Sequence, residues 1–166
     1  INIMNDFNGT SYIRNNIMRN NNNGLSTYLG NYYITNNLIV NNYNNGYSGS
    51  SGNMGNRYLK NNIIVNNDGY GIKEHQTTRI YSSYNNIWNN GSGSWANSPT
   101  TSSNDFSSDP LFKSEFDFHL TENSPCINNG SSSSEYNDLD GSRNDIGNYG
   151  GPFAKINIDA YSGINY

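Results

Sequence analysis

The chain has 166 residues, a net charge of −4 and a pI of about 4.9, and only 13% of its residues are charged. This balance argues against duplex nucleic acid as a partner, because such proteins need clustered Lys and Arg. No apolar run approaches the ~20 residues of a membrane-spanning helix. The single cysteine, Cys126, cannot form an internal disulfide, and we expect it to pack in the core.

Residues 1–9 form an incomplete version of a phrase that the chain then repeats. Ile1 and Ile3 supply apolar positions, and Asn8-Gly9 supplies a turn. No polar cover precedes them, although the end of a repeat array exposes apolar side chains and unpaired strand edges. We therefore expect Ile1 and Ile3 to contact another molecule, either a copy of this chain or part of a larger parent chain.

The repeated phrase contains Asn-Asn, two or three mostly apolar residues, Asn-Asn and a turn that ends on Gly. Its copies are IRNNIMRNNNNG (13–24), ITNNLIVNNYNNG (34–46), LKNNIIVNNDG (59–69) and SSYNNIWNNG (82–91). A repeat of about 21–25 residues is typical of a solenoid. The apolar runs are short and mostly β-branched, and Asn and Gly bound them, so they indicate strands rather than helices.

Stacked coils would place each strand parallel to its copy in the next coil. Asn tolerates the left-handed backbone of a tight corner, and its amide can hydrogen-bond the Asn of the next coil. The expected ladder contains the second Asn of each first pair, namely Asn16, Asn37, Asn62 and Asn86. We therefore predict an all-β fold, a right-handed parallel β-helix.

Variable loops rich in Tyr, Gly and Ser separate the first copies. Such loops on a regular rod commonly carry recognition. Their aromatic residues could stack on sugar rings or form a contact face, or they could pack over turns, and the sequence leaves these alternatives open. The candidate contact residues are Tyr28, Tyr32, Tyr33, Tyr47 and Tyr58 in this region, with Trp88 and Trp95 further along the chain.

A charged patch follows the third copy, with Lys73, Glu74, His75 and Arg79. Coils of this kind resemble those of the β-helix polysaccharide lyases, and this resemblance implies that a Lys or Arg could abstract a proton beside a uronate carboxylate while clustered carboxylates hold calcium. Lys73, His75 and Arg79 are thus the catalytic candidates. The acidic residues of the coils do not recur in one column, so the alternative is a solvated strand face.

The remainder of the chain is expected to cover the coils. Residues 89–108 read as a loop that carries Trp95, and residues 109–120 read as a cap. The boundaries are coils over 1–91, loop excursion and C-terminal cap of the same domain over 92–152, and a strand-like tail over 153–166. In the tail, Ile156, Ile158 and Tyr161 are candidate subunit contacts.

No cofactor is expected, with calcium as a possible exception. Asp138 and Asp140 are the candidate calcium ligands, although the rest of an EF-hand pattern is missing around them. Asp also caps tight turns without a metal. We expect Arg143 to pair with a carboxylate of this region.

Two parts of the sequence resemble known β-helix proteins. NNIIVNNDGYGI (61–72) and SYNNIWNN (83–90) resemble the coils of the pectate-lyase-like right-handed β-helix superfamily. Residues 107–152 resemble the ending of secreted or surface-attached bacterial β-helix proteins, with the pattern DP-x-F, SP-x-I, D-x-DG-x-R and DIG-x-Y. The resemblance implies an extracellular or cell-surface location.

The sequence favours a structural or interaction role without catalysis, as a fibre subunit, adhesin or surface scaffold whose ends and tail contact neighbouring molecules. The alternative is a domain that binds or cleaves an extracellular polysaccharide. If the chain is an enzyme, the resemblance implies a polysaccharide lyase.

Overall fold

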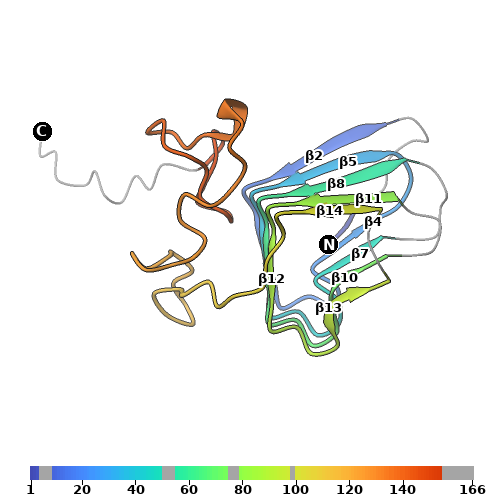
Figure 1. Cartoon of the computed structure of the whole chain (residues 1–166). Helices are drawn as coiled ribbons and strands as arrows, with labels where there is room; N and C mark the ends of the chain where they lie inside the picture. Colours follow the sequence, from blue (N-terminus) through green and yellow to red (C-terminus); the bar gives the residue numbers. More distant parts are fainter. Residues whose placement is uncertain (4–8, 50–54, 75–78, 98–99, 155–166) are drawn as a thin grey trace, which may run out of the picture.

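The computed structural model describes residues 1–3, 9–49, 55–74, 79–97 and 100–154. These residues form a parallel β-solenoid of about four turns, in which each turn contributes one strand to each of three sheets (Figure 1). The all-β solenoid expected from the repeated phrase is therefore confirmed. The tail candidates Ile156, Ile158 and Tyr161 lie outside the described residues.

The three sheets are named A, B and C, and every named strand pair in them is parallel. Sheet A contains β1 (Asn2–Ile3), β4 (Leu25–Thr27), β7 (Tyr47–Gly49), β10 (Tyr70–Lys73) and β13 (Gly93–Ala96). Sheet B contains β2 (Thr10–Arg14), β5 (Asn31–Thr35), β8 (Asn56–Lys60), β11 (Arg79–Ser83) and β14 (Thr101–Ser103). Sheet C contains β3 (Ile17–Arg19), β6 (Leu38–Val40), β9 (Ile63–Val65) and β12 (Asn86–Trp88). One short 3₁₀ helix, η1 (Ser134–Tyr136), follows the strands.

Asparagine forms the corners between sheets B and C. Asn15, Asn36 and Asn61 have φ angles of 52°, 51° and 57°, in the left-handed region that Asn adopts more easily than most residues. The residue after each corner joins a ladder, because each Asn donates its backbone and side-chain N–H groups to the side-chain oxygen of the next coil. The buried asparagine ladder expected from the sequence is present.

The fourth rung of this ladder differs from the expectation. Asn62 donates to Asn85, not to Asn86, at 2.9 Å and 2.8 Å. Tyr84 occupies the left-handed corner with φ 56°, so the fourth copy is shifted by one residue relative to its Asn-Asn pair. Asn85 donates in turn to the Asp105 carboxylate, and Asn86 lies opposite Ile63 in sheet C.

The middle strands of sheet C, β6 and β9, are buried on both faces, which explains why they contain consecutive apolar residues. Ile39 and Ile64 point into the interior of the coils, where they join the inner core with Leu25, Tyr32 and Tyr47. The alternate residues point outward and form an outer cluster with the segment after β14. The outer cluster contains Leu38, Val40, Ile63, Val65, Phe118, Cys126 and Ile146.

The segment after β14 lies along the flank of the solenoid, on the outer side of sheet C (Figure 1). Its backbone oxygens accept hydrogen bonds from the side chains of Asn15 and Asn36. The N–H of Gly147 donates to the backbone oxygen of Asn61. The segment therefore joins three successive coils at one corner column.

The stretch expected to be a loop over 89–108 contains two strands instead. β13 pairs with β10, and β14 pairs with β11, so the coils continue past residue 91. Trp95 lies opposite Ile72 and packs half-buried against the inner core. Burial of this indole gives the polar stretch enough apolar contact to continue the sheet.

Candidate functional site

The outer face of sheet B presents three columns of side chains that run along the stack of coils. Alternate residues of each strand point inward and are buried, which leaves the others on the outer face. The three columns are Thr10, Asn31, Asn56 and Arg79; Tyr12, Tyr33, Tyr58 and Tyr81; and Arg14, Thr35, Lys60 and Ser83. We call the second column the tyrosine ladder.

The rings of the tyrosine ladder stack on one another. Successive ring centroids lie 5.1, 4.8 and 5.1 Å apart, and the ring planes differ by only 15–18°. The ring faces of Tyr33 and Tyr58 are therefore occupied by neighbouring rungs. A bound molecule on this surface would contact ring edges and phenol hydroxyls rather than ring faces.

Arg14 ends the ladder at its first rung. Tyr33 covers one face of the Tyr12 ring, and the guanidinium of Arg14 lies 4.3 Å from the ring centroid, over the opposite face. The ring of Phe153 lies on the same guanidinium at 4.4 Å. This arrangement holds Arg14 by cation–π contacts, while no described carboxylate lies within ion-pair distance of it. Within the described ranges, no residue accepts a hydrogen bond from its guanidinium N–H groups.

A pocket of about 280 Å³ opens between the tyrosine ladder and the segment after β14. Sheet B contributes Tyr12, Arg14 and Tyr33, and the facing wall contains Glu135, Tyr136 and Phe153. The Nζ of Lys60 lies 4.5 Å from the centroid of the Tyr136 ring. Burial, reinforced by the neighbouring Glu135, raises the pKa of the Tyr136 phenol, so this group remains a neutral hydrogen-bonding hydroxyl.

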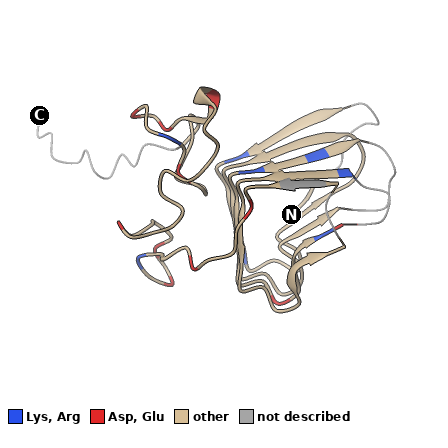
Figure 2. Cartoon of the chain, viewed as in Figure 1, with Lys and Arg blue, Asp and Glu red and all other residues tan. Residues whose placement is uncertain are grey.

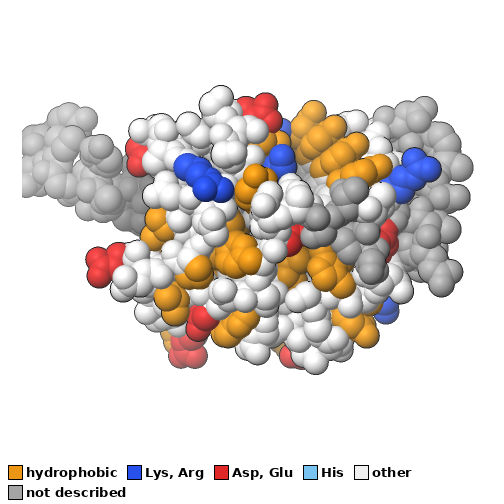
Figure 3. Space-filling model, viewed as in Figure 1, with side chains coloured by type: hydrophobic (Ala, Val, Ile, Leu, Met, Phe, Trp, Pro, Cys, Tyr) orange, Lys and Arg blue, Asp and Glu red, His pale blue; other side chains and the backbone are white. Residues whose placement is uncertain are grey.

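Basic side chains gather on this face although the chain as a whole is acidic. Figure 2 shows Lys and Arg on the strands of sheet B, whereas several acidic residues lie on the segment after β14. Figure 3 shows a row of hydrophobic side chains over sheet B with basic side chains beside it. Arg14, Lys60 and Arg79 belong to the columns beside the ladder.

The aromatic candidates from the sequence occupy three different environments. Tyr33 and Tyr58 belong to the outer ladder, whereas Tyr32 and Tyr47 are completely buried in the inner core. Tyr32 and Tyr47 were therefore wrongly placed among the surface contacts, because they occupy alternate, inward positions of their strands. Tyr28 is half-buried, and Trp88 packs half-buried against the outer cluster. Tyr12 and Tyr81 were missed. Tyr12 precedes its Asn-Asn pair by the same spacing as Tyr33 and Tyr58, whereas Tyr81 lies one residue further from its pair because Tyr84 takes the corner.

The catalytic candidates do not form a described site. Lys73 lies exposed at the end of β10 in sheet A, and Arg79 lies exposed at the start of β11 in sheet B. His75 lies outside the described residues. Glu74, which the sequence assigned only to the charged patch, is buried, and burial raises the pKa of its carboxyl to about 7.

Glu74 gives the fold a pH dependence. Because the carboxyl pKa rises from 4.5 to about 7, the folded chain holds a proton in this window that the unfolded chain releases. The contribution of Glu74 to stability is therefore full below pH 4.5 and is lost as the pH rises through about 7. We expect Glu74→Gln to remove this dependence and to stabilise the fold at pH 8 by about 3 kcal/mol, because each unit of pKa shift corresponds to about 1.4 kcal/mol. Urea denaturation of both proteins from pH 4 to 8 measures the difference, and the exposed Glu122→Gln is the control.

The candidate calcium ligands serve as turn caps. Asp138 accepts the backbone N–H groups of Asp145 and Gly151, and Asp140 accepts both the N–H and the hydroxyl of Ser142. Burial raises the pKa of Asp138, while the Ser142 hydrogen bonds lower that of Asp140. Arg143 donates to the backbone oxygens of Gly130 and Asn129 rather than to a carboxylate, contrary to expectation.

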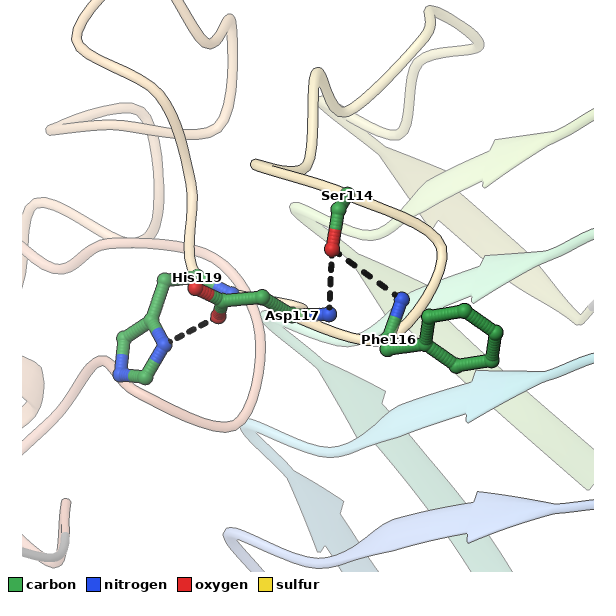
Figure 4. Close-up of polar contacts among 4 residues, drawn as sticks. All are labelled: Ser114, Phe116, Asp117 and His119. Atoms are coloured by element: carbon green, nitrogen blue, oxygen red, sulfur yellow. Dashed lines mark hydrogen bonds and ion pairs between the residues drawn. The ribbon is translucent and has the colours of Figure 1, made fainter.

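Asp117 and His119 form a pair that the sequence did not indicate (Figure 4). Nδ1 of His119 lies 2.5 Å from Oδ1 of Asp117, and the imidazole stacks on the Tyr149 ring at 3.9 Å. The hydrogen bond from His119 lowers the pKa of the Asp117 carboxyl. Ser114 accepts the N–H groups of Phe116 and Asp117, and His119 points away from it, so the three side chains do not make a nucleophile and base pair (Figure 4).

Comparison with known proteins does not assign the chain to a family. No protein-family model, no curated protein and no solved structure matches the chain. Among the residues that the structure describes, no helix is both long and apolar enough to cross a membrane.

Proposed function

We propose that this chain is an interaction module of the extracellular space or cell surface that binds an acidic polysaccharide along sheet B without cleaving it. The observation that supports this proposal is the repetition of polar and aromatic side chains on one outer face, coil after coil, with Arg14, Lys60 and Arg79 among them. The repeat distance along the rod is about 4.8 Å, the spacing of paired strands. An array with a fixed repeat suits a ligand that is itself a repeating polymer.

The chemistry of the columns supports the choice of an acidic polymer. Phenol hydroxyls and Asn amides can bind sugar hydroxyls, and guanidinium and ammonium groups can bind carboxylates. The free N–H donors of Arg14 at the pocket provide an anchoring point for one such carboxylate. Steering by the basic side chains of sheet B would favour approach to this face over the acidic remainder of the molecule.

Lys60 provides the sharpest test. We expect Lys60→Glu to weaken binding to polygalacturonate or alginate about tenfold, because an attractive contact becomes a repulsive one. Isothermal titration at low salt measures the affinity, and the loss should shrink as salt is added. Lys113→Glu makes the same charge change on the segment after β14 and should leave the affinity unchanged.

The outcomes separate the alternatives. Failure of both acidic and neutral polysaccharides to bind would refute the proposal. Equal binding of neutral polymers would refute the role assigned to the basic side chains. Appearance of unsaturated uronate products, detected by ultraviolet absorbance with and without calcium, would show cleavage and replace the binding role with a lyase.

End-to-end association is a second candidate, and one feature of the asparagine ladders favours it. β2 and β3 are edge strands, and no described residue donates to the side-chain oxygens of Asn16 and Asn21. These oxygens occupy the positions at which Asn37 and Asn42 accept from the preceding coil. Another coil could therefore continue the ladders, which sedimentation and electron microscopy would detect as stacks. A monodisperse monomer at high concentration contradicts this candidate.

A further inference from the structure

We propose that the tyrosine ladder is an oxidative cross-linking site, in which one-electron oxidation joins Tyr12 to Tyr33 through a carbon–carbon bond. The inference concerns a covalent modification of the fold and does not depend on polysaccharide binding. It rests on the geometry of the rings, the exposure of the first rung and the chemistry of phenols.

The backbone holds the two rings in position before any reaction. Tyr12 and Tyr33 are register partners in β2 and β5, and their ring centroids lie 5.1 Å apart with an angle of 18° between the planes. Because the two residues are register partners and their rings stack, the carbons beside the two hydroxyls can approach each other through small side-chain rotations. Pre-alignment of this kind replaces a collision between two mobile side chains by a short approach within one molecule.

The reaction balances with two equivalents of a one-electron oxidant, such as a peroxidase intermediate or a photo-generated metal oxidant. Each phenol loses one electron to the oxidant and one proton to water, which leaves two neutral phenoxyl radicals. The radicals couple between the carbons adjacent to the hydroxyls, and the two displaced ring hydrogens move to the oxygens. The product is a dityrosine that has lost two hydrogens in total.

The first pair of the ladder is the favoured one because Tyr12 is the most accessible rung. Its side chain is 58% exposed, while Tyr33, Tyr58 and Tyr81 are only partly so. A soluble oxidant can reach Tyr12, and water can take the phenol proton there. The hydroxyl of Tyr58, in contrast, accepts a hydrogen bond from the Asn56 amide, which ties that ring to its strand.

Such a bond would fasten the first coil to the second. It would close a loop of about twenty residues, and a covalent link across a loop of that size constrains the unfolded chain much as a disulfide does. The cross-linked protein should therefore unfold at a higher temperature than the untreated protein. The chain has one cysteine, so a carbon–carbon link is the covalent staple that its stacked side chains offer.

The test oxidises dilute protein with a ruthenium complex, light and persulfate, and then follows dityrosine fluorescence and intact mass. We expect a monomeric product two hydrogens lighter, with a yield independent of protein concentration. Trypsin cleaves after Arg14 and Arg19, between the two tyrosines, so mass spectrometry of the digest identifies the joined peptides. Tyr12→Phe keeps the stacked ring but removes the phenol, and it should lower the intramolecular yield several-fold.

Tyr43→Phe is the matched control, because Tyr43 is 68% exposed and makes no ring contact in the described part of the chain. This variant should leave the yield unchanged. Cross-links that form only between molecules, or that map to Tyr43 as often as to the ladder, would overturn the proposal. The proposal would also be overturned if Tyr12→Phe gave the same intramolecular dityrosine yield as the parent protein and the parent digest contained no joined Tyr12 and Tyr33 peptides.

Discussion

Replacement of Asn62 by alanine is expected to lower the free energy of unfolding by about 3–5 kcal/mol, a large loss for one residue. Asn62 is completely buried and stands in the middle of the ladder. Its side-chain oxygen accepts both N–H groups of Asn37 at 3.0 Å, and its amide donates to Asn85 and to the backbone oxygen of Ile34 at 2.8 Å. Alanine removes the acceptor of the Asn37 backbone N–H and the side-chain donor to the Ile34 oxygen. The Asn37 amide keeps the backbone oxygens of Ile13 and Thr35 as acceptors. The side-chain oxygen of Asn85 keeps the backbone N–H of residue 62 as a donor.

The expected cost therefore comes from four lost hydrogen bonds, a buried backbone N–H without this acceptor and the space that the side chain leaves, rather than from one lost contact. Each buried donor or acceptor without a partner costs about 1–3 kcal/mol. Guanidinium denaturation, with the midpoint compared at constant m-value, measures the loss. Asn44→Ala is the matched control, because Asn44 is exposed in the neighbouring turn and should change stability by no more than about 0.5 kcal/mol. Equal effects of the two substitutions would contradict the ladder as a source of stability.

Much of the solenoid could be predicted because its sequence signals are local and repeated. The Asn-Asn pair indicates the corner and the ladder at once, since one Asn adopts the left-handed backbone and the next makes the hydrogen bonds. The fourth copy shows the limit of that signal. Tyr84 takes the corner there. Alignment of the Asn-Asn pairs therefore predicts Asn86 as the ladder residue, whereas Asn85 makes the ladder hydrogen bonds in the structure.

The candidate site was less predictable because it depends on where strands face and on distant contacts. Tyr32 and Tyr33 are adjacent in sequence, yet one lies in the inner core and the other on the outer face. The alternation of side chains along β5 places the two residues on opposite faces of the sheet. The pocket joins Tyr12 to Phe153, and no sequence periodicity relates residues so far apart.

Arg57 is the residue whose role was hidden most completely, and Arg57→Ala is the second large effect expected. Its side chain is fully buried inside the coils. The guanidinium donates to Oγ1 of Thr27 at 3.1 Å, to the backbone oxygen of Gly30 at 2.7 Å and to that of Tyr28. It also lies 5.0 Å from the centroid of the Tyr32 ring. Two backbone carbonyls at the corner between sheets A and B therefore accept hydrogen bonds from one buried cation.

Removal of this side chain leaves two carbonyls without donors and a cavity in the inner core, and we expect a loss of about 3–5 kcal/mol. Arg57→Lys tests the geometry separately, since lysine keeps the charge but a single ammonium cannot span the three acceptors as the guanidinium does. The Arg57→Lys variant should lose nearly as much stability as Arg57→Ala if the hydrogen bonds matter. It should lose little stability if the charge alone matters. Arg79→Ala, on the exposed first position of the next strand in sheet B, is the control and should stay within about 0.5 kcal/mol of the parent protein. Chemical denaturation of the set ranks the four proteins, and an Arg57→Ala variant as stable as Arg79→Ala would show that the buried guanidinium does not hold the corner.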